Sequence, residues 1–114
     1  MRVEREMMRG SGPLAVLQLL SRRELYGYEM VEALERQTEG VLAMGQSTLY
    51  PLLYNLEAKG WVSSREVEGP EGRTRRYYAI TAQGRKELAR QRAQWRSLAE
   101  AMRRLGVLEP APGR

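Results

Sequence analysis

The stretch QSTLYPLLYNLEAKG, residues 46–60, contains the clearest periodic pattern in the chain. Its leucines recur at the i, i+3, i+4 and i+7 positions of a helix that buries one face: Leu49, Leu52, Leu53 and Leu56. Ser47 or Thr48 can cap this helix, and Pro51 lies in the first turn, where at most one backbone hydrogen bond is lost. Gly60 can end it. The stretch therefore predicts an amphipathic helix that docks on a core through its leucines.

The opposite face of this helix is polar and aromatic rather than charged. It carries Ser47, Tyr50, Pro51, Tyr54, Asn55 and Ala58. The only charged residues of the helix, Glu57 and Lys59, lie near its end. Because a face that meets only solvent normally carries more charge, this pattern indicates a contact surface.

Helices are also predicted on the N-terminal side. Residues 2–9 can form a short amphipathic helix, which the sequence Gly10–Gly12 should interrupt. Pro13 suits the first position of a second helix, and the following LAVLQLL (Leu14–Leu20) is apolar almost all round, which predicts burial. Another amphipathic helix is expected from about Tyr26 to Gln37.

After Gly60 the period changes from that of a helix to that of a strand. Trp61–Val67 and Arg75–Ile80 flank the Gly- and Pro-containing EGPEGRT, which predicts a hairpin with a basic return strand. Thr81 can cap a long helix, residues 82–105. We therefore expect one domain over residues 1–81, a C-terminal dimerisation helix over 82–106 and a flexible tail over 107–114.

The last predicted helix carries a heptad pattern about three repeats long. Its members are Leu88, Gln91, Trp95, Leu98, Met102 and Leu105. A helix of this length outgrows so small a domain, which favours a symmetric dimer interface along this seam. Alternatively, its apolar residues could pack within the chain against Val3, Met7 and the buried helix.

Composition excludes several classes of protein. With 114 residues, 42% hydrophobic and 29% charged, the chain has the size and make-up of one globular domain. It contains neither Cys nor His, so thiolate and imidazole metal sites and Ser-His or Cys-His nucleophiles are excluded. No phosphate-binding loop motif is present. We expect a cytoplasmic protein that is not an enzyme, with no metal, no cofactor, no signal peptide and no membrane span.

The net charge of +5 is unevenly distributed along the chain. Residues 22–45 have a balance of −2, whereas residues 73–92 have a balance of +6. A concentrated basic stretch is typical of a protein that binds a phosphate backbone, although a solvated Arg-rich face would give the same count.

Taken together, the elements predict a mainly α fold with a small β-hairpin: a winged helix-turn-helix followed by a long C-terminal helix. In this fold, one helix buries one face and presents the other to the major groove of DNA. A hairpin with cations near its tip can reach phosphates or a narrow minor groove. Residues 46–60 and the basic hairpin fit these two roles.

The chain also resembles the PadR-like transcriptional regulators. The matching segments are GPLAVLQLLSRRELYGYEMVEAL (Gly12–Leu34), STLYPLLYNLEAKGWV (Ser47–Val62) and RTRRYYAITAQGRKEL (Arg73–Leu88). The resemblance implies a dimeric DNA-binding regulator, usually a repressor, whose C-terminal helix forms the dimer. Tyr26 departs from the family, which often has His there, and tyrosine does not titrate near neutral pH.

These arguments assign candidate site residues. The DNA-binding set is Gln46, Ser47, Thr48, Tyr50, Pro51, Tyr54, Asn55, Arg73, Arg75 and Arg76. Within it, we expect Ser47, Thr48 and Tyr50 to contact phosphate and Tyr54 and Asn55 to face bases. The partner is then a palindromic duplex DNA bound by a homodimer. The alternative is a winged-helix module that docks another protein through the same helix and hairpin.

An effector site is a further possibility. Some short members of the family bind planar aromatic compounds between paired tryptophans at the dimer interface, so the resemblance implies a site at Trp95. Met8 and Met102 could form its adaptable walls. The simpler interpretation is that Trp95 is a large anchor of the dimer.

Overall fold

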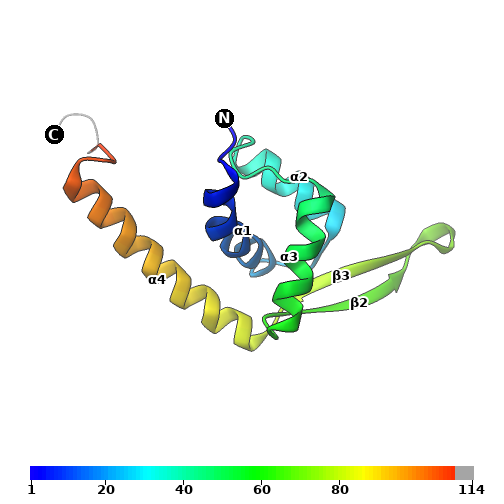
Figure 1. Ribbon diagram of the computed structural model, residues 1–114. Coiled ribbons are helices and arrows are strands. Elements are labelled where there is room, and N and C mark those ends of the chain that lie inside the picture. Colours follow the sequence, from blue (N-terminus) through cyan, green and yellow to red (C-terminus); the bar gives the residue numbers. More distant parts are fainter. Residues whose placement is uncertain (110–114) are drawn as a thin grey trace.

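The computed structural model describes residues 1–109. The elements in chain order are α1 (Arg5–Leu20), β1 (Leu25–Tyr26), α2 (Gly27–Gln37), α3 (Gln46–Ala58), β2 (Val62–Glu68), the 3-10 turn η1 (Pro70–Gly72), β3 (Thr74–Ile80) and α4 (Ala82–Leu105). Three helices form a body, a long hairpin extends from one side, and α4 extends from the other (Figure 1). The predicted mainly α, winged helix-turn-helix architecture is confirmed. No helix in the described part of the chain is both long and apolar enough to cross a membrane.

The hydrophobic core lies where α1, α2 and α3 meet the base of the sheet. Val16 and Leu17 of α1 are fully buried, as are Met30 of α2 and Leu49 and Leu53 of α3. Burial of each large side chain contributes about 1.5–3 kcal/mol. The leucines of α3 therefore hold this helix on the body, as their spacing predicts.

The sheet has three antiparallel strands in the order β1-β3-β2. The hairpin pairs in continuous register from Val62 opposite Ile80 to Glu68 opposite Thr74. The two-residue strand β1 adds to the other side of β3, where Leu25 pairs with Tyr78. This third strand was not predicted, because two residues are too short to show a period.

The predicted interruption at Gly10–Gly12 is wrong, since α1 is one continuous helix. Gly12 is buried where α1 crosses α3, and a Cβ at this position would lie 3.2 Å from a methyl group of Leu52. The glycine thus permits a close helix contact instead of ending a helix. Pro13 leaves only one backbone hydrogen bond unmade, a loss that packing of the helix on both neighbours can offset.

The start of α3 also differs in one detail. Its N-cap residue is Gly45, without a side-chain cap, so neither Ser47 nor Thr48 caps the helix. Both lie in the first turn with their hydroxyl groups exposed. These groups are therefore left for other partners.

A compact junction attaches α4 to the end of α3. The Thr81 hydroxyl donates to the carbonyl of Gly60 at 2.6 Å and accepts from the N–H of Gly84 at 2.9 Å, which confirms Thr81 as the cap. A Cβ on Gly84 would overlap the carbonyl of Trp61. Because of this junction, the direction of α4 is fixed relative to α3 and the hairpin.

The end of α4 is closed by Gly106, which has the left-handed φ of 88° that favours glycine. The N–H of Val107 donates to the carbonyl of Met102 at 2.9 Å, so the predicted tail begins with a residue bonded to the helix. Residues 110–114, which the prediction also included in this tail, lie outside the described residues.

Candidate nucleic-acid interface

The exposed face of α3 is the one that the sequence pattern indicates. Gln46, Ser47, Pro51 and Tyr54 are exposed, and 75% of the Tyr54 side chain is accessible. They lie opposite the buried leucines, because positions three and four apart share one face of a helix. The centre of this face is therefore a row of hydroxyl, amide and aromatic groups without a charged side chain.

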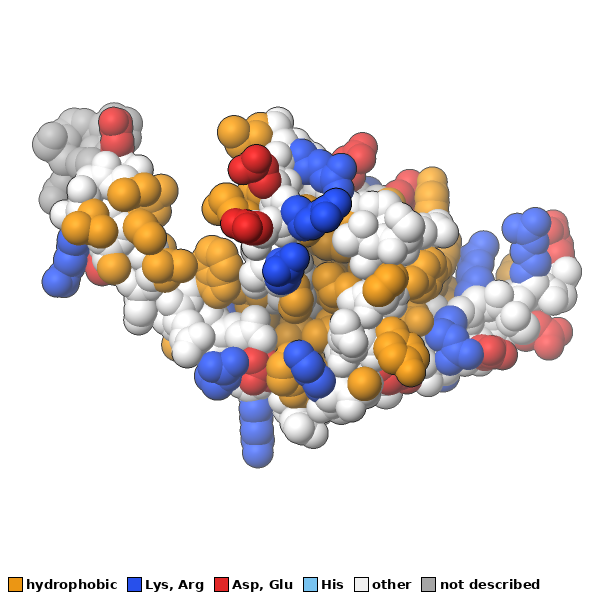
Figure 2. All heavy atoms as spheres, viewed as in Figure 1, with side chains coloured by type: hydrophobic (Ala, Val, Ile, Leu, Met, Phe, Trp, Pro, Cys, Tyr) orange, Lys and Arg blue, Asp and Glu red, His pale blue; other side chains and the backbone are white. Residues whose placement is uncertain are grey.

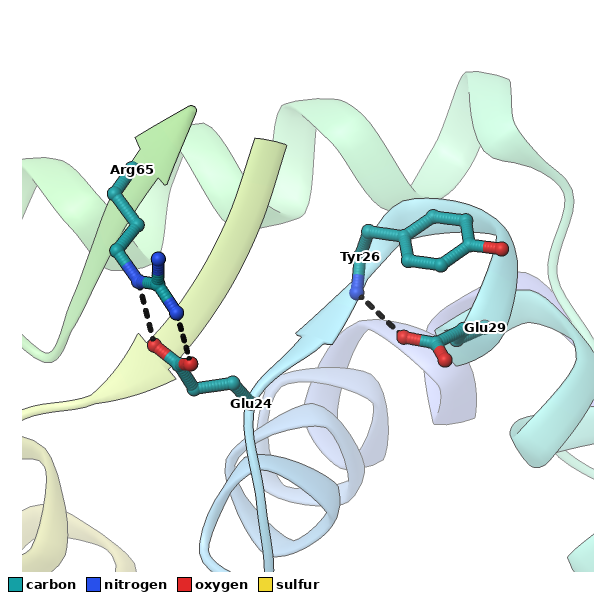
Figure 3. A network of polar contacts seen from close by, with 4 residues as sticks. All are labelled: Glu24, Tyr26, Glu29 and Arg65. Carbon is teal, nitrogen blue, oxygen red and sulfur yellow. Dashed lines mark hydrogen bonds and ion pairs between the residues drawn. The ribbon is translucent and has the colours of Figure 1, made fainter. Parts of the chain in front are cut away.

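One flank of α3 lies against the beginning of α2. The phenol of Tyr50 covers Gly27 so closely that a Cβ on this glycine would overlap the ring. Tyr50 nonetheless keeps 43% of its surface exposed. The start of α2 is fixed by the N–H of Tyr26, which donates to the carboxylate of Glu29 at 3.0 Å (Figure 3). Tyr50 thus combines a packing role with an exposed surface.

The other flank of α3 borders a groove of about 700 Å³. Thr48, Leu52 and Asn55 contribute its α3 side, and Arg2, Arg5 and Arg9 contribute from the N-terminal segment and α1. Basic side chains gather over the space between α1 and α3 in Figure 2. The structure therefore brings predicted residues Thr48 and Asn55 together with three arginines that the sequence analysis did not select.

Two of the predicted hairpin arginines are free of ion pairs among residues 1–109, namely Arg73 and Arg75. Arg73 is exposed beside the hairpin tip. The guanidinium of Arg75 lies 4.7 Å from the ring centroid of Tyr26, and that ring meets Tyr77 edge-on at 5.4 Å. Stacking on an aromatic ring orients Arg75 without neutralising it.

Arg76, the third predicted hairpin arginine, is in an ion pair. It donates to Glu66 at 2.8 Å and to the hydroxyl of Ser64 at 3.0 Å. Ser64 in turn donates to Glu57 at the end of α3. Residues 62–80 contain four arginines and three glutamates, so the hairpin has little net charge. The basic stretch counted over residues 73–92 is divided between this hairpin and α4.

On the other face of the hairpin, Arg65 forms a bidentate ion pair with Glu24. Its Nη2 and Nε donate to the two carboxylate oxygens at 2.6 and 3.1 Å (Figure 3). The hydrogen bond from Arg65 lowers the pKa of Glu24, and the same bond raises the pKa of Arg65. Both side chains remain accessible to water, so the pair adds little to stability. It links the hairpin to the segment before β1.

The predicted seam on α4 divides into two parts. Leu88 is buried in the hydrophobic core, so for this residue the alternative of packing within the chain is confirmed. Gln91 donates to Glu87 on the same helix at 2.7 Å. Beyond them, Trp95, Leu98 and Leu105 are 38%, 46% and 77% exposed, and Met102 is half-buried.

A second groove, of about 400 Å³, lies between α4 and the body. Trp95 and Arg92 border it on α4, and Leu14 and Leu19 border it on α1. Met8 instead lines the groove beside α3, so within the single chain the three predicted effector residues do not line one groove. The site between paired tryptophans of a dimer, with Met8 and Met102 as walls, stays a prediction.

Comparisons with known proteins give the same fold. A transcriptional regulator from Clostridium thermocellum is 26% identical, with a TM-score of 0.80 over 90% of this chain and 96% of that one. A PadR family regulator from Eggerthella lenta is 34% identical, with a TM-score of 0.76 over 88% and 85%. Bacillus subtilis PadR in complex with operator DNA is 24% identical, with a TM-score of 0.64 over 90% of this chain and 50% of that one. The last likeness shows a shared fold.

The family model for "Transcriptional regulator PadR-like family" matches residues 16–90. This range contains α2, α3, the hairpin and the junction with α4, and so it contains the elements that form the exposed face described above. The chain therefore belongs to the PadR-like family of transcriptional regulators.

Proposed function

We propose that this chain is a homodimeric DNA-binding repressor that acts in the cytoplasm and releases a palindromic operator when it binds a small effector. The observation that carries the proposal is the exposed, uncharged polar face of α3 between two basic regions. A helix of this kind fits the major groove, where hydroxyl, amide and phenol groups can meet base edges and phosphates. The shared fold with B. subtilis PadR, which was solved with operator DNA, supports it.

In this proposal Tyr54 and Asn55 face bases, while Ser47, Thr48 and Tyr50 contact phosphate at the start of the helix. Gln46 and Pro51 lie on the same exposed surface. Arg73 and Arg75 are the hairpin cations that are available for phosphates. Arg76 becomes available only when its bond to Glu66 opens.

The DNA-binding part is tested by selecting duplexes from a random library with the purified protein and then measuring affinity for the selected site. We expect Tyr54→Ala to weaken binding at least tenfold, because it removes the most exposed side chain of the α3 face. Tyr28→Ala is the matched control, since Tyr28 is also exposed but lies on α2. Recovery of no duplex, or equal affinity of the two variants, would instead favour the protein-docking module.

The dimer part of the proposal rests on the exposed apolar half of α4. Trp95, Leu98 and Leu105 are exposed and Met102 is half-buried on α4, a helix that extends away from the body (Figure 1). Pairing two such helices about a two-fold axis would bury them and place two α3 helices for half-sites about 34–36 Å apart. Sedimentation should show a dimer for the wild type and a monomer for Leu98→Glu. Ser97→Glu, one position away and exposed, should remain a dimer.

The effector part rests on the groove between α4 and the body. It is lined mainly by apolar side chains and bordered by the indole of Trp95. Such a groove suits a flat aromatic ring that stacks on the indole, and Met102 lies one heptad farther along α4. Titration with a planar cationic dye should quench tryptophan fluorescence in the wild type. In Trp95→Ala, Trp61 is the only tryptophan, and the dye should leave its fluorescence unchanged. Equal quenching in the two proteins would contradict an effector site here.

A further inference from the structure

We propose that Arg2, Arg5 and Arg9, named here the α1 ridge, form a second phosphate-binding site that holds the DNA backbone on the side of α3 opposite the hairpin. This inference rests on the proposed DNA-binding function and adds a contact site to it. In Figure 1, α1 and the hairpin lie on opposite sides of α3. A duplex that receives α3 in its major groove presents a backbone strand on each side of that helix.

The ridge and α3 form the two walls of one groove. Thr48 and Asn55 line it from α3, and the three arginines line it from the other side. Thr48 and Asn55 border the exposed face of α3, so the groove is continuous with the surface proposed to meet DNA. A phosphate backbone entering the groove would meet guanidinium groups on one side and a hydroxyl and an amide on the other.

The ridge is held in place by the fold. The N–H of Val3 donates to the carbonyl of Val41 at 3.0 Å, and Val3 packs against the core, so the segment that carries Arg2 is attached to the loop before α3. Arg5 and Arg9 lie on a continuous helix, and its close contact at Gly12 with Leu52 fixes the distance between α1 and α3. Order of this kind lowers the entropy lost when the arginines bind an anion.

The charges of the ridge are available. Among residues 1–109, no carboxylate forms an ion pair with Arg2, Arg5 or Arg9. Glu4 and Glu6 are neighbours in sequence, but neither lines the groove. Arg5 and Arg9 are four residues apart and share a face of α1, whereas Glu6 is adjacent to Arg5 and points in a different direction.

The spacing of the ridge suits a polyanion better than a single ion. Arg5 and Arg9 are separated by about 6 Å along the helix axis, since each residue rises 1.5 Å. One DNA strand carries a phosphate about every 3.4 Å along the duplex axis, so this separation spans about two phosphate steps and the two guanidinium groups can meet different phosphates. Arginine also binds phosphate oxygens through two N–H groups at once.

The experiment compares two triple variants that remove the same charge. Arg2→Gln/Arg5→Gln/Arg9→Gln neutralises the ridge. Arg22→Gln/Arg23→Gln/Arg36→Gln neutralises three exposed arginines around another groove, between the end of α1 and α2. The probe is a labelled mixed-sequence duplex of about 40 base pairs, because phosphate contacts do not require the operator. Affinity is measured by fluorescence anisotropy between about 50 and 200 mM salt.

We expect the ridge variant to flatten the plot of log affinity against log salt by about 0.9 for each arginine that contacts a phosphate, and to lower affinity about tenfold or more at ~100 mM salt. The control variant should change the slope by less than half as much. Arg5→Lys/Arg9→Lys should keep the slope, because it keeps the charge. Thermal melting followed by circular dichroism checks that each variant is folded. If the triple variant is unfolded, the single variants Arg5→Gln and Arg9→Gln replace it, and each should flatten the slope by about 0.9.

The outcomes separate this inference from the proposed function. If the wild type binds the duplex and the ridge and control variants have equal slopes, the α1 ridge is overturned while DNA binding stands. If the wild type does not bind duplex DNA at any salt concentration, the proposed function fails and the ridge fails with it. If only the ridge variant loses slope, both hold.

Discussion

The hairpin and the N-terminal end of α1 are both rich in arginine, yet only one of them presents mostly free charge. In the hairpin, Arg65 and Arg76 are held by Glu24 and Glu66. In the α1 ridge, no arginine is paired within the described residues. Antiparallel register places Glu66 directly opposite Arg76, whereas neither Glu4 nor Glu6 lines the groove beside the ridge. The number of basic residues in a stretch is therefore a poor guide to the charge available for a polyanion.

The largest effect is expected from a change to the contact that holds α3 against α2. The helix α3 lies between the two basic regions. Gly27→Ala should destabilise the protein by about 1–3 kcal/mol and displace α3, because the new methyl group overlaps Tyr50. DNA affinity should fall with it, whichever arginines make the contacts. Thermal unfolding and anisotropy measure the two effects.

Gly10→Ala is the control for that substitution. Gly10 lies inside α1 with open space around it, so alanine there should raise stability by about 0.5–1 kcal/mol through its higher helix propensity. Were Gly27→Ala as stable as Gly10→Ala, the close packing of Tyr50 on α2 would not be what fixes α3.

The next effect concerns the free arginines of the hairpin. Arg73→Ala/Arg75→Ala should flatten the salt dependence of DNA binding by about 1.8, while Arg76→Ala should change it by less than 0.9. The difference arises because Arg76 already has a carboxylate partner and releases fewer counterions on binding. If removal of each arginine flattened the slope equally, the ion pair between Arg76 and Glu66 would not limit the contact of Arg76 with phosphate.

A substitution of Glu66 tests the ion pair between Arg76 and Glu66 by freeing the arginine. Glu66→Gln removes the carboxylate that holds Arg76 and should steepen the salt dependence by up to about 0.9, with a several-fold rise in affinity at low salt. Glu35→Gln, which neutralises an exposed glutamate of α2 without an ion pair among the described residues, corrects for the change in net charge. An identical rise in both variants would mean that net charge alone is responsible.

The smallest effect is on the pH dependence of stability. The hydrogen bond from Arg65 lowers the pKa of Glu24 below its ordinary value of 4.5, so the ionised carboxylate is favoured in the folded state. This contribution is present at neutral pH and is lost as the pH falls through the lowered pKa. Glu24→Gln should therefore melt slightly below the wild type at neutral pH, and the gap should close as the pH falls through the lowered pKa of Glu24. A gap that widens in acid would have the wrong sign for this pair.

Much of the fold follows from local pattern. The leucine spacing of residues 46–60 predicts both the helix and its buried face, and Thr81 predicts the start of α4, because periodicity and capping depend on neighbours in sequence. The same local logic was wrong at Gly10–Gly12. The close crossing of α1 and α3 explains Gly12, and no residue near Gly12 in the sequence indicates that crossing.

By itself, the sequence determined the order of α2, α3, the hairpin and α4, the exposed polar face of α3 and the family resemblance, since each depends on residue type and short spacing. Only the tertiary structure decided which charges are free, that Leu88 belongs to the core, and that the N-terminal arginines flank α3. These properties depend on cross-strand register and on contacts such as Val3 with Val41 and Arg65 with Glu24. The two residues in each of these contacts are about 40 positions apart in sequence, so a local pattern cannot pair them.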